Sequence, residues 1–129
     1  YLFMTPRLPD AARPFVRVAY KQEGEDEVKL DAMRGVPTGA LTHVAVTFDR
    51  ETAQLSLYLD GELANESVFE DIVLSEINDV NNWLGRSQYI ADRSLSATIE
   101  EFRLYSVALT PSEVRTSFRA GPNPGFFAE

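Results

Sequence analysis

Short runs in which apolar and polar residues alternate cover most of the chain. Residues 42–48 place Val44, Val46 and Phe48 on one side of the backbone, and residues 55–59 repeat the pattern with three leucines. A period of two residues is typical of a strand that buries one face. Similar runs lie at residues 15–20 and 27–30, and a turn at residues 60–61 leads into a further strand candidate at 62–68. The pattern predicts an all-β protein, an antiparallel β-sandwich.

Turn and cap residues mark the ends of these elements. Asp60-Gly61 lies between two strand patterns and is typical of a two-residue type I′ hairpin turn. Residues 110–113, Thr-Pro-Ser-Glu, form a capping box, which predicts one short C-terminal helix that runs to about residue 119 and ends before Gly121. Residues 121–125, Gly-Pro-Asn-Pro-Gly, follow the helix and are typical of a linker. We therefore expect one domain over residues 1–120, followed by a linker or tail over 121–129.

Charge and composition exclude several classes of function. The chain has 20 acidic and 12 basic residues, and a net charge of −8 repels nucleic-acid phosphates and anionic membranes. The absence of cysteine excludes disulfides and thiolate metal sites. No apolar stretch approaches the length of a membrane span. We expect no nucleic-acid partner and no membrane insertion.

Three segments, taken in their order, resemble the laminin-G-like, concanavalin A-like lectin/glucanase jelly-roll domains of bacterial multidomain proteins. They are residues 41–48 with the hairpin at 57–61, the segment NWLGRSQY at 82–89, and IEEFRLY at 99–105 followed by residues 108–110. Leu41 stands where the family usually has tryptophan, and Glu100 where it usually has aspartate. The resemblance implies strands at 82–89 and 99–105 and a concanavalin-like jelly roll.

The beginning of the chain bears on how complete this jelly roll is. Residue 1 is tyrosine, and it opens directly inside an apolar run that is similar to a strand of some family members. We therefore expect the C-terminal two-thirds of a domain that lacks its N-terminal strands, cut from a longer protein. Such a piece exposes sheet edges and apolar surface.

The resemblance implies a function that the residues alone do not establish. It points to a non-catalytic accessory module that binds carbohydrate or another extracellular glycan, within a secreted or surface multidomain protein. The expected location is extracellular, periplasmic or on the bacterial cell surface. The alternative is a structural or protein-interaction spacer, whose partner is a neighbouring domain of the same chain.

The polar stretch at residues 88–94 is the candidate ligand contact. Tyr89 supplies a ring that can stack on a sugar, and Gln88, Asp92 and Arg93 supply hydrogen-bonding groups. Trp83 can also stack on a sugar, but we expect it to pack in the core.

Glu100 is the candidate metal ligand. It shares the parity of Phe102 and Leu104 in the predicted strand, so its carboxylate points inward and needs a partner. The resemblance implies a structural calcium here, since calcium prefers hard oxygen ligands. The favoured alternative is an ordinary hydrogen-bonded carboxylate.

A glycoside hydrolase is a third, less favoured hypothesis. Concanavalin-like glucanases carry an E-x-D-x-E motif on one strand, and Glu23, Glu25 and Glu27 have that spacing. The central residue is not aspartate, and Gly24 is typical of a hairpin tip. We expect a solvated acidic turn there and no catalytic constellation.

Overall fold

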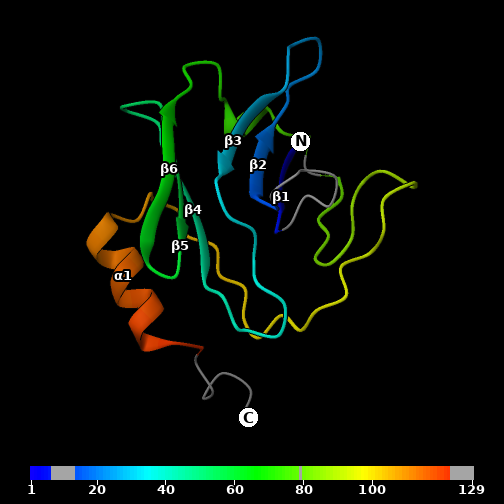
Figure 1. Cartoon of the computed structure of the whole chain (residues 1–129). Helices are drawn as coiled ribbons and strands as arrows, with labels where there is room; N and C mark the ends of the chain where they lie inside the picture. Colours follow the sequence, from blue (N-terminus) through cyan, green and yellow to red (C-terminus); the bar gives the residue numbers. More distant parts are fainter. Residues whose placement is uncertain (7–13, 79, 123–129) are drawn as a thin grey trace. The chain divides into compact units, whose positions relative to one another are not determined.

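The computed structural model describes residues 1–6, 14–78 and 80–122 of the chain (Figure 1). It divides into two compact units, one of Tyr1–Ile77 with Tyr105–Gly121 and one built around Asn78–Leu104. The elements in chain order are β1 (Leu2–Thr5), β2 (Val16–Tyr20), β3 (Val28–Ala32), β4 (Val44–Asp49), β5 (Gln54–Leu59), β6 (Glu62–Val68), the 3₁₀ helix η1 (Leu74–Glu76) and α1 (Pro111–Ala120). The four runs that the alternation predicts, and the segment 62–68 that the hairpin turn predicts, all overlap with strands.

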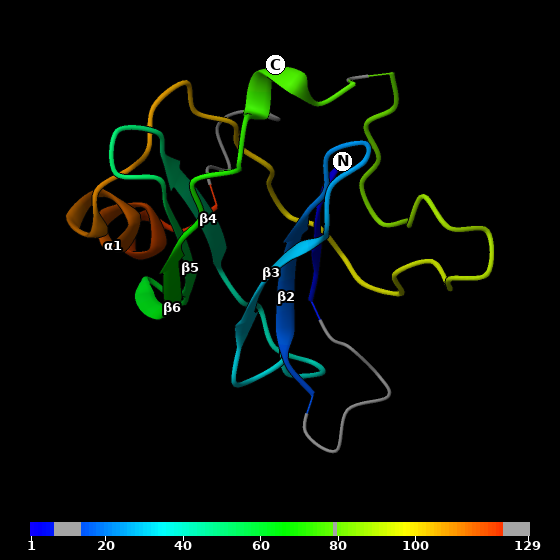
Figure 2. The ribbon, with the colours of Figure 1, turned by 90° about the horizontal axis from the view of Figure 1, so that it is seen from above.

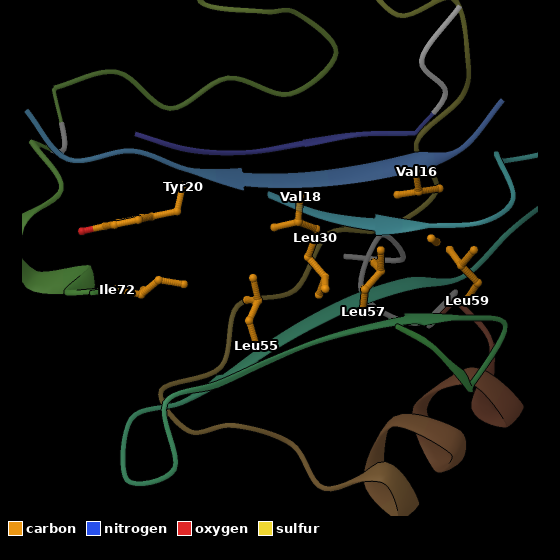
Figure 3. Close-up of a cluster of buried hydrophobic side chains, with 9 residues drawn as sticks. Val16, Val18, Tyr20, Leu30, Leu55, Leu57, Leu59 and Ile72 are labelled. Atoms are coloured by element: carbon orange, nitrogen blue, oxygen red, sulfur yellow. The ribbon is translucent and has the colours of Figure 1, made fainter. Parts of the chain in front are cut away.

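The first unit contains two antiparallel three-stranded sheets. Their strand orders are β1-β2-β3 and β4-β5-β6, and in both sheets neighbouring strands are also consecutive in the chain. The sheets face each other, with the side chains of the central strands between them (Figure 3). The predicted antiparallel β-sandwich is confirmed.

The core of this unit lies between the two sheets, as the alternation requires. Val16 and Val18 of β2 point toward Leu57 and Leu59 of β5, and all four are almost inaccessible to solvent (Figure 3). Burying a large aliphatic side chain contributes about 1.5–3 kcal/mol, so this set dominates the stability of the sandwich. Ile72 closes one end of the cluster, below the buried ring of Tyr20.

The turn between β5 and β6 has the predicted form. Asp60 and Gly61 have φ values of 54° and 78°, which is the positive pair that a type I′ turn requires. Gly61 also approaches another element closely, because a Cβ built there would lie 2.9 Å from Cδ1 of Phe118. The hairpin therefore needs glycine at this position for two separate reasons.

The C-terminal helix begins with the predicted capping box. Thr110 accepts a hydrogen bond from the backbone of Glu113, and the Glu113 carboxylate accepts one from the backbone N–H of Thr110 at 2.7 Å. α1 lies on the outer side of the β4-β5-β6 sheet (Figures 1 and 2). Val114 is completely buried, and Tyr58, on the outer face of β5, is 4% exposed, so this face of the sheet is covered too.

The edge strands leave some inward-facing side chains uncovered. Leu2 and Met4 of β1 lie opposite Tyr20 and Val18, and so share their core-facing side, yet they are 46% and 42% exposed. Val46 of β4 lies opposite the buried Leu57 and is 37% exposed. The prediction that sheet edges and apolar surface would be exposed is confirmed for these residues.

The second unit departs from the strand predictions. Residues 82–89 and 99–105 contain no helix or strand. A strand exists only when its backbone pairs with a neighbour, and the two sheets of the described residues do not include either segment. Phe102 and Leu104 therefore alternate in the sequence, but in the described residues their segment is not paired with a strand of either sheet. Both side chains are exposed.

Among the helices in the described ranges, none has the length and apolar character that a bilayer crossing demands. Of the predicted tail, Gly121 and Pro122 belong to the described part of the chain, and residues 123–129 lie outside it.

Candidate ligand-binding loop

The four predicted contact residues lie in one loop of the second unit. The backbone N–H of Leu95 donates to the carbonyl oxygen of Gly85 at 2.7 Å and so closes the segment 85–95 at its base. Inside the loop, the N–H of Asp92 donates to the carbonyl of Tyr89 at 3.2 Å. The N–H of Tyr89 donates to Oγ of Ser87 at 3.1 Å. These local bonds hold a compact surface loop of the kind that often carries binding residues.

All four predicted contact residues are exposed on this loop. Tyr89 is 50% accessible, and Gln88, Asp92 and Arg93 are accessible as well. The structure therefore brings together an aromatic ring, an amide, a carboxylate and a guanidinium within one closed segment. That combination can stack on a sugar ring and hydrogen-bond to its hydroxyl groups.

Trp83, which we expected to pack in the core, is instead 43% exposed beside this loop. Gly85 has a φ of 79°, a conformation that favours glycine, and the chain turns back there so that Arg86 lies over the indole. The guanidinium carbon of Arg86 is 4.6 Å from the centroid of the Trp83 ring, a cation–π arrangement. Hydrophobicity predicts burial of tryptophan, but here the indole packs against a charged side chain at the surface.

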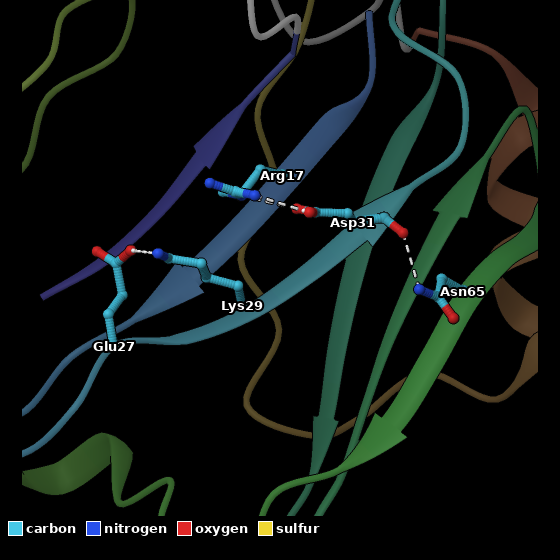
Figure 4. A network of polar contacts seen from close by, with 5 residues as sticks. All are labelled: Arg17, Glu27, Lys29, Asp31 and Asn65. Atoms are coloured by element: carbon cyan, nitrogen blue, oxygen red, sulfur yellow. Dashed lines mark hydrogen bonds and ion pairs between the residues drawn. The ribbon is translucent and has the colours of Figure 1, made fainter. Parts of the chain in front are cut away.

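A second set of polar residues lies on the outer face of the β1-β2-β3 sheet (Figure 4). Arg17 donates two hydrogen bonds to Asp31, at 2.7 and 2.8 Å, in the bidentate geometry that guanidinium and carboxylate share. The backbone carbonyl of Asp31 accepts from Nδ2 of Asn65 on β6 at 2.7 Å, which ties the two sheets together. This set has a structural part in joining strands of the sandwich.

The acidic segment before β3 forms a hairpin tip, as predicted. Gly24 has a φ of 86° and the N–H of Glu25 donates to the carbonyl of Gln22. A shallow cleft of about 220 Å³ lies here, and its lining includes four acidic residues, Glu25, Asp26, Glu27 and Asp71. The cleft is therefore lined largely by carboxylates.

The surroundings of Glu27 favour its ionised form. The hydrogen bond from the hydroxyl of Tyr1 lowers the pKa of Glu27 below its ordinary value, and Lys29, 3.0 Å away, lowers it further against the opposing effect of desolvation. A general acid of a glycosidase needs a raised pKa instead. The environment of Glu27 thus does not suit the acid of a hydrolase.

Glu100 does not point into a core. Its side chain is exposed, and the neighbouring Glu101 forms an ion pair with Arg103 at 2.6 Å. Within the described ranges, no group of three or more histidine, aspartate or glutamate residues is arranged so that it could hold a metal ion. Calcium takes about six to eight oxygen ligands, and the surroundings of Glu100 do not fit that set. Calcium at Glu100 stays a prediction from resemblance, and the inward orientation expected for its carboxylate was wrong.

The family match accounts for the architecture. The model of the family described as the concanavalin A-like lectin/glucanases superfamily, Laminin_G_3, matches residues 4–115. The chain belongs to this family. Among curated proteins, none matches the chain.

One solved structure shares the fold. It is residues 221–444 of an S-layer domain-containing protein from Clostridium thermocellum, 24% identical to the chain, with a TM-score of 0.51. The match covers 79% of this chain and 50% of the other, so the chain spans about half the length of that structure. At this level of identity the similarity shows the fold alone.

Proposed function

We propose that this domain is a non-catalytic module that binds a glycan through the loop 85–95 and the neighbouring Trp83. The observation that carries the proposal is the exposure of two aromatic rings, Tyr89 on the closed loop and Trp83 just before it. Polar side chains of the same loop lie beside Tyr89 in the sequence. Exposed aromatic rings supply flat apolar faces on which the C–H faces of sugars stack.

Family membership supports this proposal without deciding it. The description of the superfamily names both lectins, which bind sugars, and glucanases, which cleave them, so the fold alone does not decide between binding and catalysis. Binding is favoured over hydrolysis because the lowered pKa of Glu27 and its hairpin-tip setting do not suit an acid catalyst. We further propose that the module works outside the cytoplasm as part of a larger surface protein. The solved structure of the same fold supports this, since it comes from an S-layer domain-containing protein.

The test is a glycan array with the 129-residue chain, followed by titration calorimetry on the best sugar. We expect Tyr89→Ala to abolish detectable binding. Tyr105→Ala is the matched control, because Tyr105 is equally exposed, at 50%, and lies outside the loop. Retained binding in Tyr89→Ala, or equal loss in both variants, would overturn the assignment to this loop.

The spacer function predicts a different outcome from the same array. A spacer or docking domain binds no sugar, and its contacts are with a neighbouring domain of the same chain. The uncovered apolar side chains Leu2 and Met4 of β1 favour such a contact, because inward-facing residues at a sheet edge invite a covering partner. Absence of binding to every glycan would replace the glycan-binding proposal by this one.

A further inference from the structure

The binding loop carries a charge opposite to that of the rest of the protein. The whole chain has 20 acidic and 12 basic residues, whereas residues 80–98 contain two arginines, Arg86 and Arg93, and a single acidic residue, Asp92. Both arginines are exposed. In a protein of net charge −8 this segment is a basic site that an anionic ligand can approach.

The two arginines are also available for a ligand. Arg17, Arg34, Arg103 and Arg115 each form an ion pair with a carboxylate. Within the described part of the chain, neither Arg86 nor Arg93 takes part in such an ion pair. Their N–H groups are accordingly not committed to a protein carboxylate there.

The contact of Arg86 with Trp83 leaves its guanidinium suited to bind an oxyanion such as a carboxylate. Its guanidinium carbon lies 4.6 Å from the centroid of the Trp83 indole, and this cation–π contact restricts a side chain that would otherwise sample many rotamers. A guanidinium presents its N–H groups as a planar fork, which matches the oxygens of a carboxylate or a phosphate. Loss of rotamer freedom on binding is then smaller than for a free arginine.

We propose that the ligand of this loop is an acidic glycan whose sugar carboxylate pairs with Arg86, while a neighbouring ring stacks on Tyr89. This inference rests on the proposed glycan-binding function and names its ligand class. Arg93 adds a second positive charge on the same loop, and Gln88 and Asp92 supply hydrogen-bonding groups for the sugar hydroxyls. The acidic remainder of the protein repels anionic glycans.

The experiment compares three probes by titration calorimetry with the 129-residue chain. They are an oligogalacturonate, which carries a carboxylate on each sugar, a neutral laminari-oligosaccharide of equal length and a sulfated dextran oligosaccharide, whose charge comes from sulfate groups alone. We expect the oligogalacturonate to bind at least about tenfold more tightly than the neutral sugar, because charge-assisted hydrogen bonds are roughly twice as strong as neutral ones.

Variants of Arg86 separate charge from geometry. Arg86→Gln should weaken oligogalacturonate binding about tenfold and reduce its dependence on salt, and Arg86→Lys should restore only part of the affinity, since lysine lacks the planar fork. Arg50→Gln is the matched control, because Arg50 is an exposed arginine of the β4–β5 turn, outside the loop. Its affinity should stay unchanged.

The outcomes distinguish this inference from the function on which it rests. Tight binding of the neutral sugar, with Arg86→Gln unaffected, overturns the acidic-glycan assignment and leaves glycan binding intact. Binding of the sulfated probe alone overturns the carboxylate assignment. No binding to any probe or to any glycan of the array overturns both proposals.

Discussion

Gly61 and Phe118 are in such close contact that no side chain fits between them. A Cβ at Gly61 would lie 2.9 Å from Cδ1 and 3.0 Å from Cβ of Phe118. Phe118 lies near the end of α1, and its ring centroid is also 5.9 Å from that of His43, just before β4. One glycine thus serves both the β5–β6 hairpin and the docking of the helix on its sheet.

Replacement of Gly61 by alanine should be unusually costly. The left-handed backbone costs about 1–2 kcal/mol for a residue with a Cβ, and the collision with Phe118 adds to it. We expect Gly61→Ala to lower the free energy of unfolding by about 2–4 kcal/mol in urea titration. Gly39→Ala is the control, since Gly39 has a φ of 76° with nothing within 4 Å of the added Cβ. Equal losses in the two variants would show that the helix does not dock here.

The opposite change at Ala53 should stabilise the protein. Ala53 adopts a φ of 54° in the turn before β5, so it carries left-handed strain that glycine does not have. The relief of about 1–2 kcal/mol exceeds the entropy cost of glycine in the unfolded chain, about 0.4–1 kcal/mol. Ala53→Gly should raise the melting temperature, and Ala40→Gly, at a residue without positive φ, should lower it slightly. A lower melting temperature in Ala53→Gly would contradict the turn geometry.

Trp83 and Leu57 should respond very differently to truncation. Leu57 is fully buried between the sheets, so Leu57→Ala should cost about 2–5 kcal/mol of unfolding free energy. Trp83 is 43% exposed, and Trp83→Ala should cost less than about 1 kcal/mol. Chemical denaturation of both variants shows whether the Trp83 indole lies at the surface or in the core. A cost for Trp83→Ala that matched the leucine variant would place the tryptophan in the core after all.

Acid should destabilise the domain through two glutamates. The pKa of Glu27 is lowered by the hydrogen bond from Tyr1, and the pKa of Glu113 by the backbone and side chain of Thr110. A carboxyl with a lowered folded-state pKa stabilises the protein above the unfolded value of 4.5 and loses that contribution as pH falls through the folded value. Stability should therefore be level near neutrality and fall below about pH 4.5.

Variants identify which carboxyl is responsible for the acid response. Glu27→Gln and Glu113→Gln should each lower stability at pH 7 and flatten the fall below the unfolded pKa, because each removes one linked proton. Melting curves between about pH 7 and pH 3 measure this. An unchanged slope in both variants would mean that other groups control acid unfolding.

Local patterns predicted the regular elements of this protein well. Alternation at β4 and β5, the Asp60-Gly61 pair and the Thr110 cap each depend on neighbours in the chain, so each could be inferred without a partner element. The short η1 helix was missed, because Leu74–Glu76 carries no cap or periodicity strong enough to mark it.

The candidate site was predicted only in part. The position of Gln88, Tyr89, Asp92 and Arg93 in a polar segment indicated an exposed loop, and all four are exposed in the structure. The loop closure by Leu95 and the stacking of Arg86 on Trp83 could not be inferred, since they depend on how the chain turns at Gly85. Neither the periodicity nor the composition of the sequence predicts whether the Trp83 indole packs against apolar side chains or against a guanidinium.

The sequence by itself determined which residues alternate, where the hairpin turns and where the helix begins, because these features follow from interactions within a few residues. Only the tertiary structure decided which alternating segments become strands. Residues 99–105 place Phe102 and Leu104 on one side as a strand would, but a strand also needs a hydrogen-bonded neighbour. Tertiary structure likewise placed Trp83 at the surface, because burial depends on the elements that meet around a side chain and not on its hydrophobicity alone.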